Sequence, residues 1–167
     1  MELLIVRHAI ACERNRQRWP DDADRPLSSR GVARARRAAA GLRRIAPRPL
    51  QVLTSPLERT RHTAALLTEF AGWPDAQPCP QLRPGAATQA LLSLLAQRTA
   101  ACVAVVGHEP DLSHLLVACL PGKISGNAFA LRKMGAALVV FPASVRSGGG
   151  ELQWLLAPRL LRLARHG

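Results

Sequence analysis

The chain has 167 residues, of which 48% are hydrophobic, so it is long enough to bury a core and is predicted to form a single domain over residues 1–167. Its net charge of +12 favours anionic partners, although a codon bias towards arginine would produce the same charge; the three Trp and three Phe are too few for a nucleic-acid stacking surface. The apolar runs are too short to cross a membrane, no secretory signal opens the chain, and the cysteines form no CxxC pair. We therefore expect a cytoplasmic protein with free thiols, no membrane partner and no metal ion.

The first predicted strand brings a cation and an imidazole to one edge of a sheet. Residues 3–6 are all apolar, as in a strand that is covered on both faces, and Arg7 and His8 follow directly. Ligands of open α/β sheets bind at the carboxyl ends of the strands. Arginine offers a planar fork of donors to phosphate oxygens, and a neutral histidine nitrogen can attack phosphorus. Taken alone, the dipeptide would more often be a solvated polar pair.

A polar loop then leads to an arginine-rich helix. Residues 12–25 are polar and charged, and Ser28 or Ser29 is the expected N-cap of a helix that ends at Ile45. The apolar residues of this helix recur at helical spacing, and most of its arginines lie on other faces. We interpret these arginines as a solvated face; a docking surface for an acidic protein is the alternative.

The second strand is followed by a helix whose start also favours an anion. Residues 50–54 are predicted to form the strand, and Ser55 is the N-cap candidate of a helix that ends near Phe70. The free N–H groups and the positive end of the helix dipole favour an anion there. Arg59 lies one turn into this helix, within reach of the edge that carries Arg7.

The third strand repeats the pattern of the first. A helix is expected over residues 87–97, and residues 102–106 form a continuous, β-branched run that ends at Gly107 and His108. A further helix is expected over residues 111–120. Three predicted strand ends thus carry groups that suit a phosphoryl dianion.

The end of the chain has a different character. Residues 136–141 and 151–156 flank a glycine-rich turn, which predicts an antiparallel hairpin near one edge of the sheet, and residues 158–166 predict a basic terminal helix. The strands and helices before this hairpin alternate, which is typical of a parallel sheet with helices on both faces. The fold class is therefore predicted to be α/β: a three-layer α/β/α sandwich with a mostly parallel sheet and an antiparallel C-terminal hairpin.

Four stretches of the chain match, in the expected order, the motifs of one known family. They are Leu4–Ala9, Arg25–Gly31, Thr54–Ala64 and Val106–Ser113, with weaker matches at residues 133–136 and 154–158. In these stretches the chain resembles the histidine phosphatase superfamily, which includes the cofactor-dependent phosphoglycerate mutases, and within it the small SixA-type phosphohistidine phosphatases. The resemblance implies a phosphoglycerate mutase-like fold and a phosphatase that needs no cofactor or metal ion.

The resemblance also implies a role for each residue at the strand ends. His8 is expected to be the nucleophile that becomes transiently phosphorylated. Arg7, Arg59 and His108 are expected to line the phosphate pocket, where phosphate or sulfate would bind, and to stabilise the charge of the transferring group. His108 is not expected to bind a metal ion, because no set of carboxylates or cysteines accompanies it.

The chain departs from the family pattern in its proton donor. Many members carry a carboxylate after the second helix, but residues 80–85 contain no Asp or Glu. Glu109 and Asp111 are the fallback donors, although either could simply cap the following helix. Because an alkyl phosphate gains much from a general acid and a labile P–N bond gains less, the missing carboxylate favours a phosphohistidine substrate.

The expected partner is another protein. The short segment between Arg59 and His108 leaves little room for a lid, which favours an open pocket for a phosphohistidine-bearing protein such as a histidine-containing phosphotransfer domain. A broad-specificity phosphomonoesterase for small molecules, or a mutase, is the alternative with the same chemistry; a mutase would need a closed pocket. An alternative of a different class is a basic nucleic-acid- or protein-binding module without catalysis, and the joint presence of the four site residues argues against it.

Overall fold

The structure, a computed structural model, describes residues 1–125 and 128–164. Its six strands form one sheet in the order β3-β2-β4-β1-β5-β6. The strands are β1 (Glu2–Arg7), β2 (Gln51–Thr54), β3 (Ala76–Pro78), β4 (Cys102–Gly107), β5 (Ala136–Val140) and β6 (Glu151–Leu156). Strands β1 to β4 pair in parallel, whereas β5 pairs antiparallel with β1 and β6 pairs antiparallel with β5. The predicted mixture of a parallel sheet and a C-terminal hairpin is confirmed.

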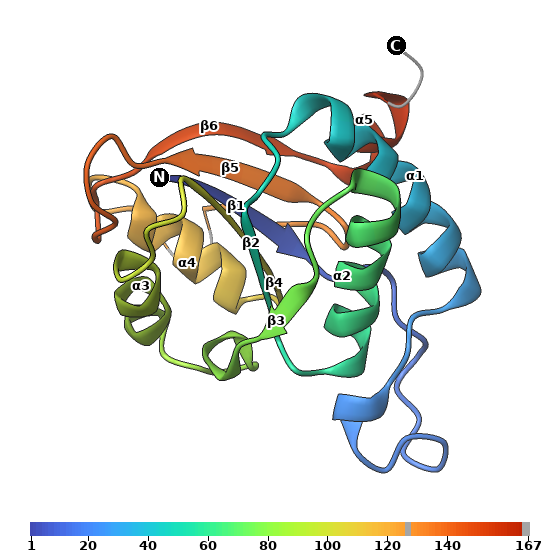
Figure 1. The fold of residues 1–167 in the computed structure, drawn as a ribbon. Helices are drawn as coiled ribbons and strands as arrows, with labels where there is room; N and C mark the ends of the chain where they lie inside the picture. The colour runs from blue at the N-terminus through green and yellow to red at the C-terminus, as the bar shows by residue number, and fades with distance from the viewer. Residues whose placement is uncertain (126–127, 165–167) are drawn as a thin grey trace.

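Helices cover both faces of this sheet (Figure 1). One face carries α1 (Ser29–Ile45), α2 (Glu58–Ala71) and α5 (Pro158–Leu163), and the other carries α3 (Thr88–Ala96) and α4 (Asp111–Cys119). Two short 3-10 helices, η1 (Asp22–Asp24) and η2 (Pro80–Leu82), lie in the loops. The predicted three-layer α/β/α sandwich is therefore confirmed. Among the described residues, no helix is long and apolar enough to cross a membrane.

The apolar run of the first strand follows from its central position. β1 lies between β4 and β5, and the side chains of residues 3–6 have no exposed surface. Leu4 and Val6 pack in the core under α1 and α2, while Leu3 and Ile5 pack in the core under α3 and α4. A strand between two cores needs apolar side chains on both faces, and this explains why the run is continuous rather than alternating.

Several element boundaries differ from the predicted ones. Ser28, rather than Ser29, caps α1, because its side chain accepts a hydrogen bond from the Gly31 N–H. The prediction of Ser55 as the N-cap of α2 is wrong: this helix begins at Glu58, and the Ser55 hydroxyl contacts an imidazole of the site instead. Strand β3 was not predicted. Helix α5 ends at Leu163, and residues 165 and 166 of the predicted terminal helix lie outside the described residues.

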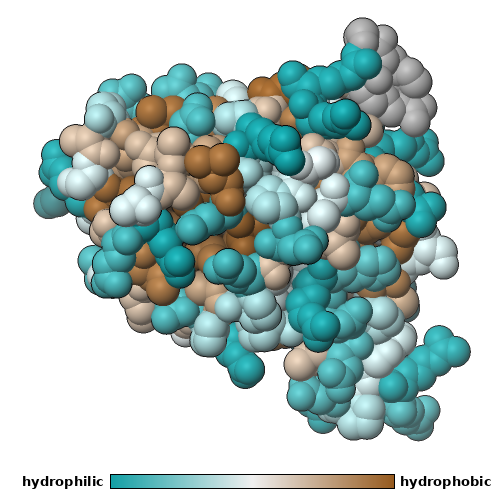
Figure 2. Space-filling model, in the orientation of Figure 1, coloured by the Kyte–Doolittle hydropathy of each residue, from teal (hydrophilic) through white to brown (hydrophobic). Residues whose placement is uncertain are grey.

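One loop projects from the carboxyl edge of the sheet (Figure 1). It comprises residues 12–26, between Ala11 and Leu27, which are joined by an isolated β-bridge. None of these loop residues is buried, and Figure 2 shows the projection as mostly hydrophilic. We call this segment the projecting loop; it carries part of the site described next.

Candidate active site

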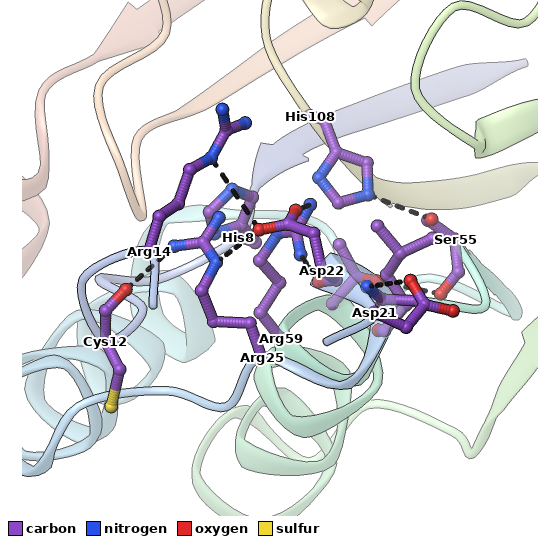
Figure 3. Close-up of polar contacts among 12 residues, drawn as sticks. His8, Cys12, Arg14, Asp21, Asp22, Arg25, Ser55, Arg59 and His108 are labelled. Carbon is purple, nitrogen blue, oxygen red and sulfur yellow. Dashed lines mark hydrogen bonds and ion pairs between the residues drawn. The ribbon is translucent and has the colours of Figure 1, made fainter. Parts of the chain in front are cut away.

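The carboxyl ends of β1 and β4 bring two imidazoles together. Arg7 pairs with Gly107 in the parallel ladder, and the His8 N–H donates to the Gly107 carbonyl at 3.1 Å. The ring centroids of His8 and His108, the residues that follow these strands, are consequently 5.1 Å apart. Figure 3 shows both rings facing the charged side chains of Arg59 and the projecting loop. The structure thus places Arg7, His8, Arg59 and His108 around one site.

His8 is held in the form that can act as a nucleophile. Its side chain is only 6% exposed, and Nδ1 lies 2.7 Å from the Ala9 carbonyl oxygen. Because a carbonyl oxygen can only accept, Nδ1 carries the proton and Nε2 keeps its lone pair. Burial, reinforced by the positive charges of Arg59 and Arg7, lowers the pKa of His8 to about 4, against an opposing effect of the Ala9 hydrogen bond. The imidazole is therefore neutral at neutral pH.

His108 is also neutral and is held by the second strand. Burial, followed by the effects of His8 and Arg59, lowers its pKa to about 3. Its Nε2 lies 2.9 Å from the Ser55 hydroxyl oxygen, and the Ser55 N–H donates to the Val106 carbonyl. Ser55, at the end of β2, thus orients the His108 imidazole. The position of Ser55 before a helix did not indicate this role in the sequence.

The two arginines keep unused donors inside the site. Arg7 donates from Nη1 to the Leu131 carbonyl at 2.8 Å, and Arg59 donates from Nη1 to the Asp22 carbonyl at 2.7 Å. The Nε atoms of both arginines are buried, and neither has a hydrogen-bond partner among the described residues. Buried donors without partners are costly, so an oxyanion that accepts from both guanidinium groups fits this arrangement.

The projecting loop supplies two charged residues that sequence reasoning missed. The Asp22 carboxylate accepts a hydrogen bond from Arg25 Nε at 2.8 Å and lies 3.2 Å from Arg59 Nη2 (Figure 3). Burial raises the pKa of Asp22, but the hydrogen bond from Arg25 and the charge of Arg59 outweigh it, so the net shift is downward and the carboxylate is ionised at neutral pH. The acidic residues just before the family-like stretch that starts at Arg25 are the available signal; a polar, charged loop does not by itself indicate a role in the site.

The two fallback proton donors have other contacts in the structure. Glu109 accepts hydrogen bonds from the Ser113 hydroxyl at 2.7 Å and from the Leu131 N–H at 2.8 Å. Since the Leu131 carbonyl is the acceptor for Arg7, Glu109 helps to position that arginine. Asp111 accepts from the Gly85 N–H at 3.1 Å, which ties α4 to the loop between η2 and α3. Proton donation by either residue stays a prediction.

The backbone around the nucleophile is held from two further sides. The buried Thr63 hydroxyl donates to the Arg59 carbonyl at 2.6 Å and accepts from the Ala9 N–H at 3.0 Å, which joins α2 to the end of β1. The Met134 N–H contacts the carbonyl oxygens of Arg7 and His8 at 3.1 and 3.2 Å. Met134 adopts a φ of 64°, a left-handed conformation that is uncommon for a residue with a side chain.

The chemistry of this arrangement is that of phosphoryl transfer rather than of a metal centre. The described residues contain no group of three or more His, Cys, Asp or Glu side chains that could hold a metal ion. A neutral imidazole with a free lone pair, a second neutral imidazole and two guanidinium groups instead provide a nucleophile and donors for a transferring phosphoryl group.

Comparison with known proteins leads to the same chemistry. Residues 3–84 match the profile of the histidine phosphatase superfamily (branch 1). The chain is 34% identical over 156 residues to an uncharacterized protein of Picosynechococcus, with 92% of this chain and 89% of that protein covered.

Two solved structures also resemble the chain. The structure of the protein histidine phosphatase SixA complexed with tungstate is 26% identical and aligns with a TM-score of 0.83 over 96% of this chain and 99% of that chain. A candidate phosphohistidine phosphatase SixA of Nakamurella multipartitia is also 26% identical, with a TM-score of 0.75 over 94% and 95% of the two chains. The phosphoglycerate mutase-like α/β fold expected from the sequence motifs is confirmed. The family profile and the SixA structures agree with the arrangement of imidazoles and arginines at the strand ends. The chain belongs to the histidine phosphatase superfamily and is a phosphatase of SixA-like fold.

Proposed function

We propose that the protein removes the phosphoryl group from a phosphohistidine on another protein, through a phosphohistidine intermediate on His8. The observation that carries this proposal is the neutral His8 imidazole, whose Nδ1–H is held by the Ala9 carbonyl so that Nε2 can attack. In the first step Nε2 bonds to phosphorus and the P–N bond of the substrate breaks; its electron pair stays on the leaving imidazole, which departs neutral because its other ring nitrogen takes a proton from solvent. In the second step water attacks phosphorus, the bond between phosphorus and His8 Nε2 breaks, and the protons of that water leave with inorganic phosphate.

The cationic groups supply the electrostatic part of this mechanism. Arg7 and Arg59 hold buried Nε donors that suit the equatorial oxygens of a transferring phosphoryl group. His108, fixed by Ser55, adds a third polar group on the side of β4. The SixA neighbour was solved as a complex with tungstate, a tetrahedral oxyanion like phosphate, and this supports oxyanion binding by a protein of this fold.

The carboxylates support a phosphohistidine rather than an alkyl phosphate as substrate. Asp22 is the carboxylate that contacts Arg59, and its lowered pKa keeps it ionised, so it is not a ready proton donor at neutral pH. Residues 80–85 contain no acid, and Glu109 is occupied by two hydrogen bonds. A P–N bond can break with less help from a general acid than an alkyl ester bond, and this matches the groups present.

We further propose that the partner is a histidine-containing phosphotransfer domain or a similar phosphoprotein. We also propose that the protein acts in the cytoplasm and that residues 1–167 form a single domain. One sheet with a core on each face, built from both ends of the described chain, supports the single domain. The four cysteines, Cys12, Cys79, Cys102 and Cys119, are free thiols, which supports a reducing compartment.

The experiment that tests the proposal compares two substrates in the presence of a chelator. Phosphate release from a phosphorylated histidine-containing phosphotransfer domain and from 4-nitrophenyl phosphate is measured for wild type and His8→Ala. We expect turnover of the phosphoprotein, its loss in His8→Ala, and a phosphoenzyme that survives base and is destroyed by acid. His114→Ala, which changes an exposed histidine of α4, is the matched control and should leave turnover unchanged.

Two other outcomes would separate mechanism from substrate. Turnover of 4-nitrophenyl phosphate alone would keep His8 as nucleophile but replace the phosphoprotein by a small phosphomonoester. Turnover of neither substrate would contradict the proposal and would favour a basic binding module.

A further inference from the structure

A strongly basic groove adjoins the phosphate pocket. Its volume is about 710 Å³, and it lies between the end of β1, the first turns of α1, the segment before β5, and α5. Six cationic side chains line what we call the basic groove: Arg7, Arg34, Arg132, Lys133, Arg159 and Arg162. Because Arg7 lines the basic groove and also contributes to the phosphate pocket, a ligand of the groove would lie next to the transferring phosphoryl group.

Two walls of the basic groove are helices that pack firmly on each other. α5 lies against α1 (Figure 1), and its Leu161 is fully buried in the same core as α1. Gly41 permits this close approach, because a Cβ atom at that position would collide with the Leu161 carbonyl oxygen. Arg34 of α1 and Arg162 of α5 are therefore half-buried cations on two helices with a fixed separation.

No cation of the basic groove forms an ion pair among the described residues; the charge of Glu109 acts on Arg7, which also belongs to the phosphate pocket. Every ion pair among the described residues involves Asp22 or Glu58, and neither of these lines the groove. Burial, and then repulsion from Arg34 and other nearby arginines, lowers the pKa of Arg162; burial and neighbouring arginines lower that of Lys133. An uncompensated cluster of like charges beside an active site attracts and orients an anionic partner.

We propose that the basic groove docks an acidic segment of the phosphohistidine-bearing protein, adjacent to the phosphohistidine that enters the phosphate pocket. This inference rests on the proposed function and adds the surface that selects the partner. Ile10, Met134 and Pro158 line the groove between the cations, so an amphipathic helix that carries carboxylates beside small apolar side chains fits it. Nucleic acid fits less well, because none of the described lining residues is aromatic.

The test reverses charges inside and outside the basic groove on the same protein. The double variant Arg34→Glu/Arg162→Glu is compared with Arg43→Glu/Arg44→Glu, which reverses two exposed arginines at the other end of α1. Steady-state constants are measured with a phosphorylated histidine-containing phosphotransfer domain and with 4-nitrophenyl phosphate. We expect the groove variant to raise KM for the phosphoprotein about tenfold. In the groove variant we expect kcat on both substrates and KM for 4-nitrophenyl phosphate to change less than about twofold. In the control variant we expect every one of these constants, including KM for the phosphoprotein, to change less than about twofold.

Several results would overturn the inference. An equal rise in KM in both double variants would indicate general charge attraction, and an equal loss on both substrates would indicate damage to the phosphate pocket. A short DNA duplex that inhibits wild type but not the groove variant would identify nucleic acid as the ligand. If circular dichroism shows that the double variant does not fold, Arg159→Glu replaces it, because Arg159 is an exposed residue of the same groove, and Arg43→Glu becomes the control. An unchanged KM for the phosphoprotein in Arg159→Glu would then count against docking.

The kinetics of wild type and of the groove variants, taken together, separate the docking inference from the proposed function. Turnover of the phosphoprotein with normal KM in every groove variant would remove the docking inference and keep the proposed function. Turnover of 4-nitrophenyl phosphate without any turnover of the phosphoprotein would remove both.

Discussion

The two sides of the phosphate pocket are built in opposite ways. On the strand side, His8 and His108 are buried and neutral, and the backbone at His8 is held by β4, α2 and the segment before β5. On the loop side, the projecting loop has no buried residue and contributes the ionised Asp22, which is held by the charges of Arg25 and Arg59. Packing therefore fixes the nucleophile, whereas the charge balance around it depends on a surface loop.

This difference corresponds to two requirements of phosphoryl transfer. In-line attack requires that His8 be positioned accurately, which packing and buried hydrogen bonds achieve. Charge stabilisation requires guanidinium groups that can bind the incoming oxyanion. Asp22 already lies on Arg59, so the substrate oxyanion and the Asp22 carboxylate compete for the same cation.

After the loss of turnover in His8→Ala, the largest effect is expected at Arg59, where the two sides meet. Arg59→Ala removes a donor to the phosphoryl oxygens and leaves Asp22 without its buried partner, so kcat should fall about 10²- to 10³-fold on either substrate. Steady-state kinetics measure this change. Arg61→Ala, on the same helix but with a side chain that is 62% exposed, should leave kcat within about twofold of wild type. A loss below tenfold for Arg59→Ala would mean that the strand side alone stabilises the charge.

A loss of stability in acid is expected to come mainly from the strand side. An unfolded histidine has a pKa of about 6.5, whereas the pKa values of His8 and His108 are lowered to about 4 and about 3. Between these values the unfolded chain binds more protons, so the free energy of unfolding falls as the pH falls. The expected loss is about 2 kcal/mol per imidazole between pH 7 and pH 5, measured by denaturant unfolding at both values.

Matched variants assign this loss to its source. His108→Asn should lose about 2 kcal/mol less than wild type between pH 7 and pH 5, whereas the exposed His114→Asn should behave as wild type. Asp22 does not contribute in this window: its lowered pKa adds stability above the unfolded value of about 3.9, and that stability is lost only as the pH falls further. An unchanged pH dependence in His108→Asn would contradict a buried neutral imidazole.

The strand side could be predicted from local sequence, and the loop side could not. Continuous apolar runs such as residues 3–6 identify central strands, and the residues that follow them lie at the carboxyl edge by the geometry of a parallel sheet. His8 and His108 could therefore be placed together although they are far apart in the chain. Arg59 was placed correctly at that edge for the same reason, even though the predicted start of its helix was wrong.

The loop side depends on contacts that leave no periodic signal. Asp22 reaches Arg59 across the pocket, and a polar stretch with several acids does not indicate which of them makes this contact. Strand β3 was missed for a similar reason: its three residues, Ala76–Pro78, are too few for a periodicity and depend on pairing with β2. The charges of the basic groove come from four separate segments of the sequence, and only the packing of α5 on α1 brings Arg34 and Arg162 together.

A smaller effect is expected from the hydrogen bonds that join α2 to the nucleophile. Thr63→Val keeps the shape of a fully buried side chain but leaves the Ala9 N–H without its acceptor, so the free energy of unfolding should fall by about 1–2 kcal/mol. Thr68→Val on the same helix is the control, because that hydroxyl only donates to carbonyl oxygens and no N–H depends on it. Equal losses in both variants would mean that the link to Ala9 adds nothing to the strand side.

The smallest effect should come from Asp22, the part of the loop side that competes with substrate. Asp22→Asn removes the negative charge but keeps the size of the side chain. Inorganic phosphate should then inhibit about two- to fivefold more strongly, as expected from a half-exposed ion pair worth up to about 1 kcal/mol. The inhibition constant for phosphate, measured with 4-nitrophenyl phosphate as substrate, tests this expectation.

The control for this change lies two residues away in the projecting loop. Asp24→Asn alters an exposed carboxylate that forms no ion pair among the described residues, so it should leave the inhibition constant unchanged. Weaker phosphate inhibition in Asp22→Asn alone would reverse the interpretation. The ion pair between Asp22 and Arg59 would then position the guanidinium group for the oxyanion. The loop side would in that case share the positioning role that is now assigned to the strand side.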